Sequence, residues 1–193
     1  MNSVKYRLIA GLGNPGEQYA GSRHNLGAEI ISRLAKSQGV ALTNSSKLPG
    51  RLAWLNGVHD KTLLFQPELF YNNSGQAIMT AAGFYKISPP DILVIHDELA
   101  LPFGTLRLRL GGSHSGNKGI KSLIDCLGEE FWRLRAGIAG PHRPIGDDTG
   151  FVLGRFTADE RELLPDIAAA ASKIALDFSL GRPLTPSTTK IDQ

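Results

Sequence analysis

Histidine and asparagine residues stand beside glycine-rich turns in this sequence, and an aspartate follows an apolar run; together these residue types could act on a carbonyl compound. His24, within the letters RHN, closes the loop after the first apolar run, and Asp97, within HDE, follows a later apolar run. A carboxylate that accepts the Nδ1 proton of a histidine leaves Nε2 as a free base. If the two apolar runs are neighbouring strands, His24 and Asp97 together could activate a water molecule.

Two other kinds of catalysis fit the sequence less well. No serine stands in a G-x-S-x-G turn, and Cys126 falls in an apolar segment, so a covalent nucleophile has no obvious candidate. His24, His96, His114 and Asp97 are conceivable metal ligands, but the chain has no H-x-x-x-H or C-x-x-C spacing. We therefore favour direct attack by water.

The loop before His24 matches the dinucleotide-binding pattern G-x-G-x-x-G at residues 11–16. In dinucleotide-binding proteins a helix begins within this pattern, whereas Pro15 and Gly21 here forbid an uninterrupted helix. The acidic residue that would bind the ribose is also missing from the end of a second strand. Two interpretations remain: a structural turn, or a substrate loop in which Asn14 presents its amide group to a ligand.

Two further segments could contact a carbonyl or anionic ligand. Asn72 stands at the start of a predicted helix and could either cap that helix or bind substrate. The glycine-rich loop 111–119 opens another helix, whose N-terminal amides suit a phosphate or carbonyl oxygen. Arg107 and Arg109 precede this loop. Singly they could be ordinary surface residues, but as a group the arginines favour an anionic partner.

Composition and charge predict a globular protein with one basic region. The 193 residues are 41% hydrophobic and 20% charged, which excludes a disordered or collagenous chain. The net charge is only +3, yet residues 104–143 hold seven Lys or Arg and three Asp or Glu, which predicts a local basic surface. The single cysteine suits a reducing compartment. Because no membrane span or secretory signal is evident, we expect a cytoplasmic protein.

Hydrophobic periodicity predicts the alternating strands and helices that would position these residues. A helix after His24 would begin near Asn25 and end at Gly39, and a last helix with a capping box at Thr157 would be divided in two at Pro165. The predicted strands are 4–12, 51–58, 62–66, 92–95, 105–110 and 132–139, with 51–58 and 62–66 joined as a hairpin through 59–61. The predicted helices are 26–38, 72–86, about ten residues after the glycine-rich loop, and 157–180.

This order of elements predicts an α/β fold with a single domain. We expect a twisted, mostly parallel (mixed) central sheet flanked by helices, with the C-terminal helices as a lid. The domain would span residues 1–182, and residues 183–193 would form a disordered tail. Because ligand crevices in open α/β sheets lie beyond the carboxyl ends of strands, His24 and Asp97 should meet at such an end.

The motifs occur in an order that resembles the bacterial-type peptidyl-tRNA hydrolases. The most specific are G-x-G-N-P-G with R-H-N-x-G, and H-D-E-x-x-L-P. The matching segments, which together span about residues 5–180, are GLGNPGEQYAGSRHNLG, FYNNSGQAI, ILVIHDELALPFG, LRLGGSHSGNKGIKSLI, FWRLRAGI and GFVLGRF.

The resemblance implies hydrolysis of the ester between a peptidyl group and the 3'-terminal ribose of prematurely released peptidyl-tRNA. This reaction frees tRNA for reuse and belongs to translation and ribosome rescue. It implies no metal and no cofactor, with His24 as the base that deprotonates water and Asp97 as its orienting carboxylate. The acceptor end of tRNA would be the main partner. We expect a monomer without a membrane or an obligate protein partner. The substrate-binding residues would be Asn14, Tyr19, Tyr71, Asn72, Asn117 and Lys118, and Arg109 and Arg135 would grip a tRNA phosphate.

Two positions depart from the family pattern. The glycine-rich loop of the family usually reads H-N-G, with an asparagine that helps to place the water or the peptide, whereas this chain has Asn117, Lys118 and Gly119. A lysine ammonium donates but cannot accept, so Lys118 could support an oxyanion without replacing that amide, and Asn117 could take its place after a small shift. Tyr71 stands where the family commonly has methionine, which replaces a pliable apolar wall with a rigid one bearing a hydroxyl.

Two alternatives to a hydrolase stay open on the sequence alone. One is a non-catalytic RNA-binding relative, since Lys118 departs from the family and some plant organelle homologues act in intron splicing. The presence of both His24 and Asp97 argues against it. The other is an unrelated α/β esterase or nucleotide enzyme, which predicts measurable nucleotide binding.

Overall fold

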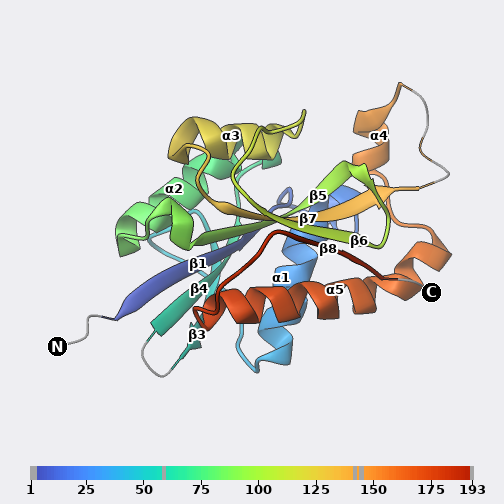
Figure 1. Cartoon of the computed structure of the whole chain (residues 1–193). Coiled ribbons are helices and arrows are strands. Elements are labelled where there is room, and N and C mark those ends of the chain that lie inside the picture. Colours follow the sequence, from blue (N-terminus) through green and yellow to red (C-terminus); the bar gives the residue numbers. More distant parts are fainter. Residues whose placement is uncertain (1–3, 58–59, 141–142, 144–145, 192–193) are drawn as a thin grey trace.

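A twisted eight-stranded sheet runs through the computed structural model, which describes residues 4–57, 60–140, 143 and 146–191 (Figure 1). The strands lie in the order β2-β3-β4-β1-β5-β7-β6-β8. Their bounds are β1 Lys5–Gly11, β2 Thr43–Asn44, β3 Gly50–Asn56, β4 Asp60–Pro67, β5 Ile92–Pro102, β6 Thr105–Leu110, β7 Trp132–Ala139 and β8 Ser187–Lys190. The central strands β4, β1, β5 and β7 pair in parallel, and the outer pairs are antiparallel. The predicted α/β fold with a mixed sheet is confirmed, with its parallel part at the centre.

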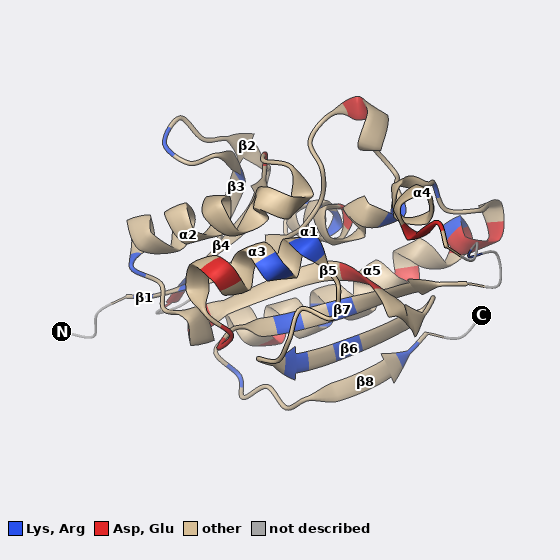
Figure 2. Cartoon of the chain, turned by 90° about the horizontal axis from the view of Figure 1, so that it is seen from above, with Lys and Arg blue, Asp and Glu red and all other residues tan. Residues whose placement is uncertain are grey.

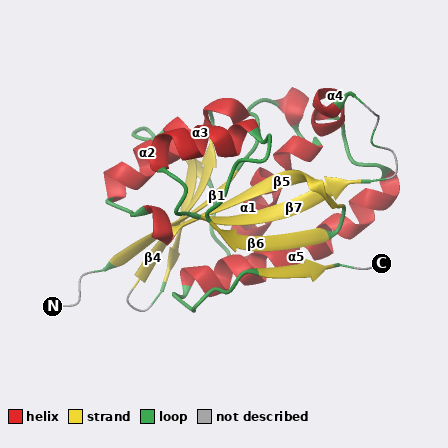
Figure 3. Ribbon diagram, turned by 45° about the horizontal axis from the view of Figure 1, so that its top comes forward, coloured by secondary structure: helices red, strands yellow, loops and turns green. Residues whose placement is uncertain are grey.

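Helices cover both faces of this sheet (Figure 1, Figure 3). The helices α2 (Ser74–Tyr85) and α3 (Lys118–Leu127) lie on one face, and α1 (Leu26–Ser37) and α5 (Ala158–Ser179) lie on the other. The shorter elements are α4 Asp148–Leu153 and the 3₁₀ turns η1 Glu17–Tyr19, η2 Arg23–Asn25, η3 Tyr71–Asn73 and η4 Pro89–Asp91. Among the described residues, no helix has the length and apolar character needed to cross a membrane.

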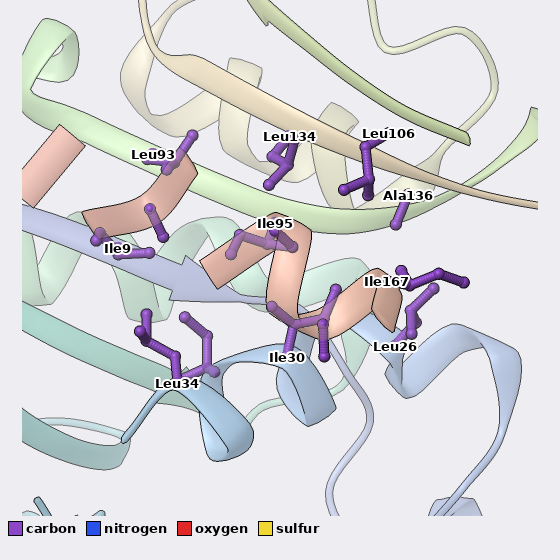
Figure 4. Packing of buried hydrophobic residues seen from close by; sticks show 14 of the residues in the cluster. Ile9, Leu26, Ile30, Leu34, Leu93, Ile95, Leu106, Leu134, Ala136 and Ile167 are labelled. Atoms are coloured by element: carbon purple, nitrogen blue, oxygen red, sulfur yellow. The ribbon is translucent and has the colours of Figure 1, made fainter. Parts of the chain in front are cut away.

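Each face of the sheet has its own apolar core, because successive side chains of a buried strand point to opposite faces. In the larger cluster, Ile9, Ile95 and Leu134 from three neighbouring central strands pack with Ile30 of α1 and Ile167 of α5 (Figure 4). All five side chains are almost fully buried. The apolar runs that were predicted to be buried strands therefore form the rigid centre that carries the loops of the site.

The strand β5 is longer than the predicted 92–95. It continues to Pro102, so that His96, Asp97 and Glu98 lie within the strand rather than beyond its end. The reason is β7, which pairs with β5 through Glu98 and again, in shifted register, at Pro102. On the other side β1 has already ended at Gly11, opposite Ile95. Asp97 thus projects past the end of β1, where the crevice was expected.

The predicted hairpin is present as the antiparallel pair β3 and β4. Of the predicted connection 59–61, His59 lies outside the described residues, and Asp60 and Lys61 belong to β4.

The C-terminal third differs most from the sequence-based expectations. Pro165 does not divide the last helix: α5 is continuous, because Leu163 and Ile167 on either side of the proline both pack on the sheet while Pro165 itself faces solvent. None of the predicted helices lies between residues 139 and 157, but α4 begins there at Asp148. Of the two C-terminal helices, α4 borders the cleft described below, whereas α5 is part of the core.

The disorder predicted for residues 183–193 is wrong for the described part of that segment. Ser187–Lys190 forms β8, which pairs antiparallel with β6 at the edge of the sheet. Its residues are all exposed and polar, so they carry no hydrophobic pattern, and backbone pairing with an open strand edge defines the element.

Candidate active site

His24 and Asp97, which are 73 positions apart in the chain, meet in the folded molecule. Nδ1 of His24 lies 2.9 Å from Oδ2 of Asp97. The Asp97 side chain is 2% exposed and that of His24 is 17% exposed, so the carboxylate is enclosed while the imidazole reaches solvent. Because Nδ1 is engaged by the carboxylate, Nε2 is the nitrogen available as a base.

Two glycines allow this meeting because they let α1 approach the sheet closely. A Cβ atom on Gly27 would lie 2.2 Å from the carbonyl oxygen of Ile95, and one on Gly11 would lie 2.2 Å from the carbonyl oxygen of Gly27. The amide of Leu12 donates to the Ile95 carbonyl oxygen at 3.0 Å. The turn η2, which carries His24 just before α1, is thereby held against β5 at the level of Asp97.

Tyr71 is the second partner of Asp97. Its hydroxyl donates to Oδ1 of Asp97 at 2.6 Å, and its ring stacks on the imidazole of His24 with 3.5 Å between ring centroids and 16° between planes. The Tyr71 side chain is buried. Burial, with the negative charge of Asp97 as a further cause, raises the pKa of Tyr71 well above its usual value, so the hydroxyl stays protonated and donates.

Asn117 ties the glycine-rich loop to the same group. Its Oδ1 accepts from the amide of Ile120 and so caps α3, and its Nδ2 donates to the hydroxyl of Tyr71 at 3.1 Å and to the backbone oxygen of Asp97 at 3.2 Å. Gly119 leaves room for the tyrosine ring, since a Cβ there would lie 2.4 Å from it.

Asn14 and Asn25 fix the loop in front of His24. The backbone amide of Asn14 donates to Oδ1 of Asn25, and Nδ2 of Asn25 donates back to the Asn14 carbonyl oxygen. Oδ1 of Asn14 accepts from the amide of Tyr71 at 2.8 Å. Asn25 is therefore at the predicted cap position of α1, but its side chain holds the loop instead of the helix. The Nδ2 group of Asn14, which makes no hydrogen bond to the described residues, is left for a ligand.

These side chains line a cleft of about 580 Å³. Seven of the residues predicted from the sequence border it: Asn14, His24, Tyr71, Asn72, Asp97, Asn117 and Lys118. Lys118 is exposed at its rim. Tyr19 lies in η1 and does not border the cleft, and neither do Arg109 and Arg135.

One wall of the cleft was not anticipated from the sequence. Thr149, Val152 and Leu153 of α4 border it, and Arg143 donates both to the Leu99 carbonyl oxygen and to Asp148. The local signal was the N-cap: Oδ1 of Asp147 accepts from the amide of Gly150. The six-residue helix is too short for its periodicity to reveal it.

Basic residues lie on the neighbouring strands β6 and β7 (Figure 2). Arg109, Arg133 and Arg135 border a small cavity that shares Glu98 and Ser115 with the cleft. Arg135 donates to Glu98 at 2.9 Å, and both side chains are buried. Arg109 makes no ion pair with any described residue.

Two buried groups at this small cavity have unused hydrogen-bonding atoms. Nε and Nη2 of Arg133 and Nε2 of His96 find no partner among the described residues. Burial lowers the pKa of Arg133 to about 10, with nearby Arg109 contributing, which leaves it charged at neutral pH. The positively charged donors of Arg133 suit an anionic group.

No group of three or more His, Cys, Asp or Glu side chains in the described part of the chain is arranged to hold a metal ion.

Comparisons with known proteins identify the family. Residues 8–191 match the family model described as peptidyl-tRNA hydrolase. The peptidyl-tRNA hydrolase of Chlorobium limicola is 43% identical over 175 residues, which cover 90% of this chain and 92% of that protein. That of Haemophilus influenzae is 44% identical over 177 residues, covering 89% and 88%.

A solved structure agrees with these sequence matches. The crystal structure of peptidyl-tRNA hydrolase from Acinetobacter baumannii superimposes with a TM-score of 0.84 and 35% identity, over 94% of this chain and 91% of that one. Sequence, fold and the extent of the match point the same way. The chain therefore belongs to the peptidyl-tRNA hydrolase family.

Proposed function

We propose that this enzyme cleaves the ester bond of peptidyl-tRNA with a water molecule that His24 activates and Asp97 helps to orient. Membership of the family supports the substrate, peptidyl-tRNA, and the product, free tRNA. The observation that carries the mechanism is the contact of 2.9 Å between His24 and a buried carboxylate at the floor of an open cleft.

The reaction needs only a proton carrier and a water molecule. Nε2 of His24 takes a proton from the water as its oxygen attacks the ester carbonyl carbon. When the tetrahedral intermediate collapses, the ribose oxygen leaves and takes that proton from His24, which is ready for the next cycle. Asp97 keeps its charge throughout and stabilises the imidazolium that forms between the two steps.

Polar groups around the dyad have separate tasks in this proposal. The free Nδ2 group of Asn14 and the exposed Asn72 are suited to the amide bond of the peptidyl group, which an aminoacyl substrate lacks. The ammonium of Lys118 can support the oxyanion from the rim. The side-chain amide of Asn117 already makes hydrogen bonds to α3, Tyr71 and Asp97, so we assign it a role in holding the site together. Contact of Tyr19 with substrate stays a prediction.

Arg109 and Arg135 would hold a tRNA phosphate beside the cleft, together with Arg133. Among the described residues, two nitrogens of Arg133 have no hydrogen-bond partner and Arg109 has no ion pair, which supports an anion there. Contacts to phosphate carry no base information, so they would serve every tRNA alike. We further propose that the protein works in the cytoplasm as a monomer and that it needs no cofactor.

One assay separates this function from the alternatives. The protein is incubated with N-acetyl-aminoacyl-tRNA and with aminoacyl-tRNA, each with and without a chelator. We expect cleavage of the first substrate only, at the same rate in the presence of the chelator. Equal cleavage of both substrates, or of neither, would contradict the proposal, and loss of cleavage with the chelator would refute the metal-free mechanism.

A further inference from the structure

Tyr71 has contacts that its expected role in binding substrate does not explain. It is 3% exposed, so little of its surface is free for a ligand. Instead its ring covers one face of the His24 imidazole, and its hydroxyl donates a hydrogen bond to Asp97, the carboxylate partner of His24. A methionine, which the family commonly has at this position, could supply the apolar contact but no hydrogen bond.

Because of the hydroxyl, the negative charge of Asp97 is shared between two donors, His24 and Tyr71. Each carboxylate oxygen has one side-chain donor: Oδ2 faces His24 at 2.9 Å, and Oδ1 accepts from Tyr71 at 2.6 Å. The tyrosine oxygen in turn accepts from Asn117 at 3.1 Å, which fixes its direction. A donor on one oxygen stabilises the carboxylate and weakens the support that it gives to a positive imidazole on the other.

We propose that Tyr71 is a positioning residue that holds the Asp97 carboxylate in its orientation and makes His24 a weaker base than the dyad alone would. This inference rests on the proposed role of His24 and goes beyond it, because it assigns the pH range of activity in this chain to a hydroxyl group. A weaker base stays neutral at lower pH, so the enzyme remains active in more acidic conditions.

Other charged and titratable groups near the dyad come from several elements. His96 and Glu98 flank Asp97 on β5, and Lys118 lies at the start of α3. Asp148 begins α4 and pairs with Arg143. Substitution of Tyr71 by phenylalanine leaves all of them in place and keeps the ring on His24. A change in titration would therefore report the hydroxyl.

The test is a pH titration of His24 in the parent protein and in Tyr71→Phe. NMR of the imidazole resonances measures the midpoint in each protein. The His24 signal is identified by its loss in His24→Gln. We expect the midpoint in Tyr71→Phe to rise by about half a pH unit, the scale of part of one hydrogen bond to a charged group. In the hydrolysis assay the acidic limb of kcat/KM should move by the same amount. Activity well below the midpoint should then fall about threefold relative to the plateau at high pH.

A matched control and a second variant complete the experiment. Tyr85→Phe removes a hydroxyl from α2, where the ring packs on Tyr6 and Trp54 away from the cleft, and should leave the midpoint unchanged. Tyr71→Met also lacks the hydroxyl and should raise the midpoint of the His24 titration. It replaces Tyr71→Phe in the test if that variant does not fold.

The inference is overturned if the midpoint of His24 moves by less than about 0.2 pH unit in the folded Tyr71 variants, a difference too small for a lost hydrogen bond. It is also overturned if the loss of activity is equal at every pH, as a purely structural role would give. Since the NMR titration needs no substrate, it tests Tyr71 even if the hydrolysis assay fails. Hydrolysis with an unmoved midpoint would reject the role of Tyr71 alone.

Discussion

His96, Asp97 and Glu98 are consecutive on β5, but they have different partners and different tasks. The alternation of a strand sends Asp97 toward His24 and sends His96 and Glu98 toward the small cavity with Arg135. The meeting of His24 and Asp97 could be predicted because each follows an apolar run, and the two runs were expected to be neighbouring strands, as they are. The bond from Tyr71 to Asp97 could not be predicted, because it depends on the rotamers of two buried side chains.

The buried imidazole of His96 makes stability depend on pH. Its Nδ1 lies 2.8 Å from the Asp97 backbone oxygen, and burial lowers its pKa, outweighing the charges of Asp97 and Glu98. The unfolded chain binds this proton more tightly, so the free energy of unfolding should fall as pH drops below the ordinary histidine value of 6.5.

Urea denaturation between pH 7.5 and 5.5 checks this. We expect His96→Asn, which keeps a donor for the Asp97 oxygen, to lose less stability over this range than the parent protein, while His114→Asn on the exposed loop behaves like the parent. Parallel curves for the parent and His96→Asn would contradict the assignment.

At the scale of elements, Arg23 joins the turn that carries His24 to the start of α5. Its guanidinium donates to Glu160 and to the Arg155 carbonyl oxygen, each at 2.6 Å, and lies 4.3 Å from the ring centroid of Phe151 in α4. Glu160 also accepts from the Thr157 amide as part of the predicted capping box. The buried ion pair between Arg23 and Glu160 thus connects three parts of the site: α4 at the wall of the cleft, the cap of α5, and the turn that carries His24.

Arg23→Met should therefore destabilise the protein strongly. Removal of one partner of a buried ion pair costs about 3 kcal/mol or more, because the other charge remains buried. The control is Arg33→Met, whose exposed pair with Glu29 on α1 should contribute less than about 1 kcal/mol. Chemical denaturation of both variants measures the difference. Equal free energies of unfolding would show that the Arg23 contact contributes little.

The elements that could be predicted from the sequence are those with a strong apolar pattern. β1 and α1 have such a pattern and lie within a residue or two of their predicted bounds. α4 and β8 have none, since one has six residues and the other is entirely exposed, and both form through contacts with distant parts of the chain. For the same reason the wall of the cleft was missing from the predicted site.

At the scale of the whole molecule, a net charge of +3 hides an uneven distribution. Arginines lie on the neighbouring strands β6 and β7 (Figure 2), and three of them border the small cavity that adjoins the cleft. A tRNA whose acceptor end enters the cleft would bring a phosphate to these arginines. Binding that depends on such contacts releases counterions and weakens as salt rises.

Arg109→Gln should weaken binding of every tRNA to a similar degree and reduce the slope of log K against log salt by about one. Arg51→Gln on β3, toward the opposite edge of the sheet, is the matched loss of charge and should leave the slope unchanged. Fluorescence anisotropy with several uncharged tRNAs over a range of salt concentrations measures both. An unaltered slope in Arg109→Gln would show that Arg109 does not contact a tRNA phosphate.

The most direct test of the central claim is the single-turnover rate of N-acetyl-aminoacyl-tRNA cleavage by His24→Ala, measured alongside its affinity for uncharged tRNA. If His24 is the base, the rate should fall by about 10²-fold or more while the affinity stays within about twofold of the parent. Cleavage at the parental rate by the folded variant would contradict the account.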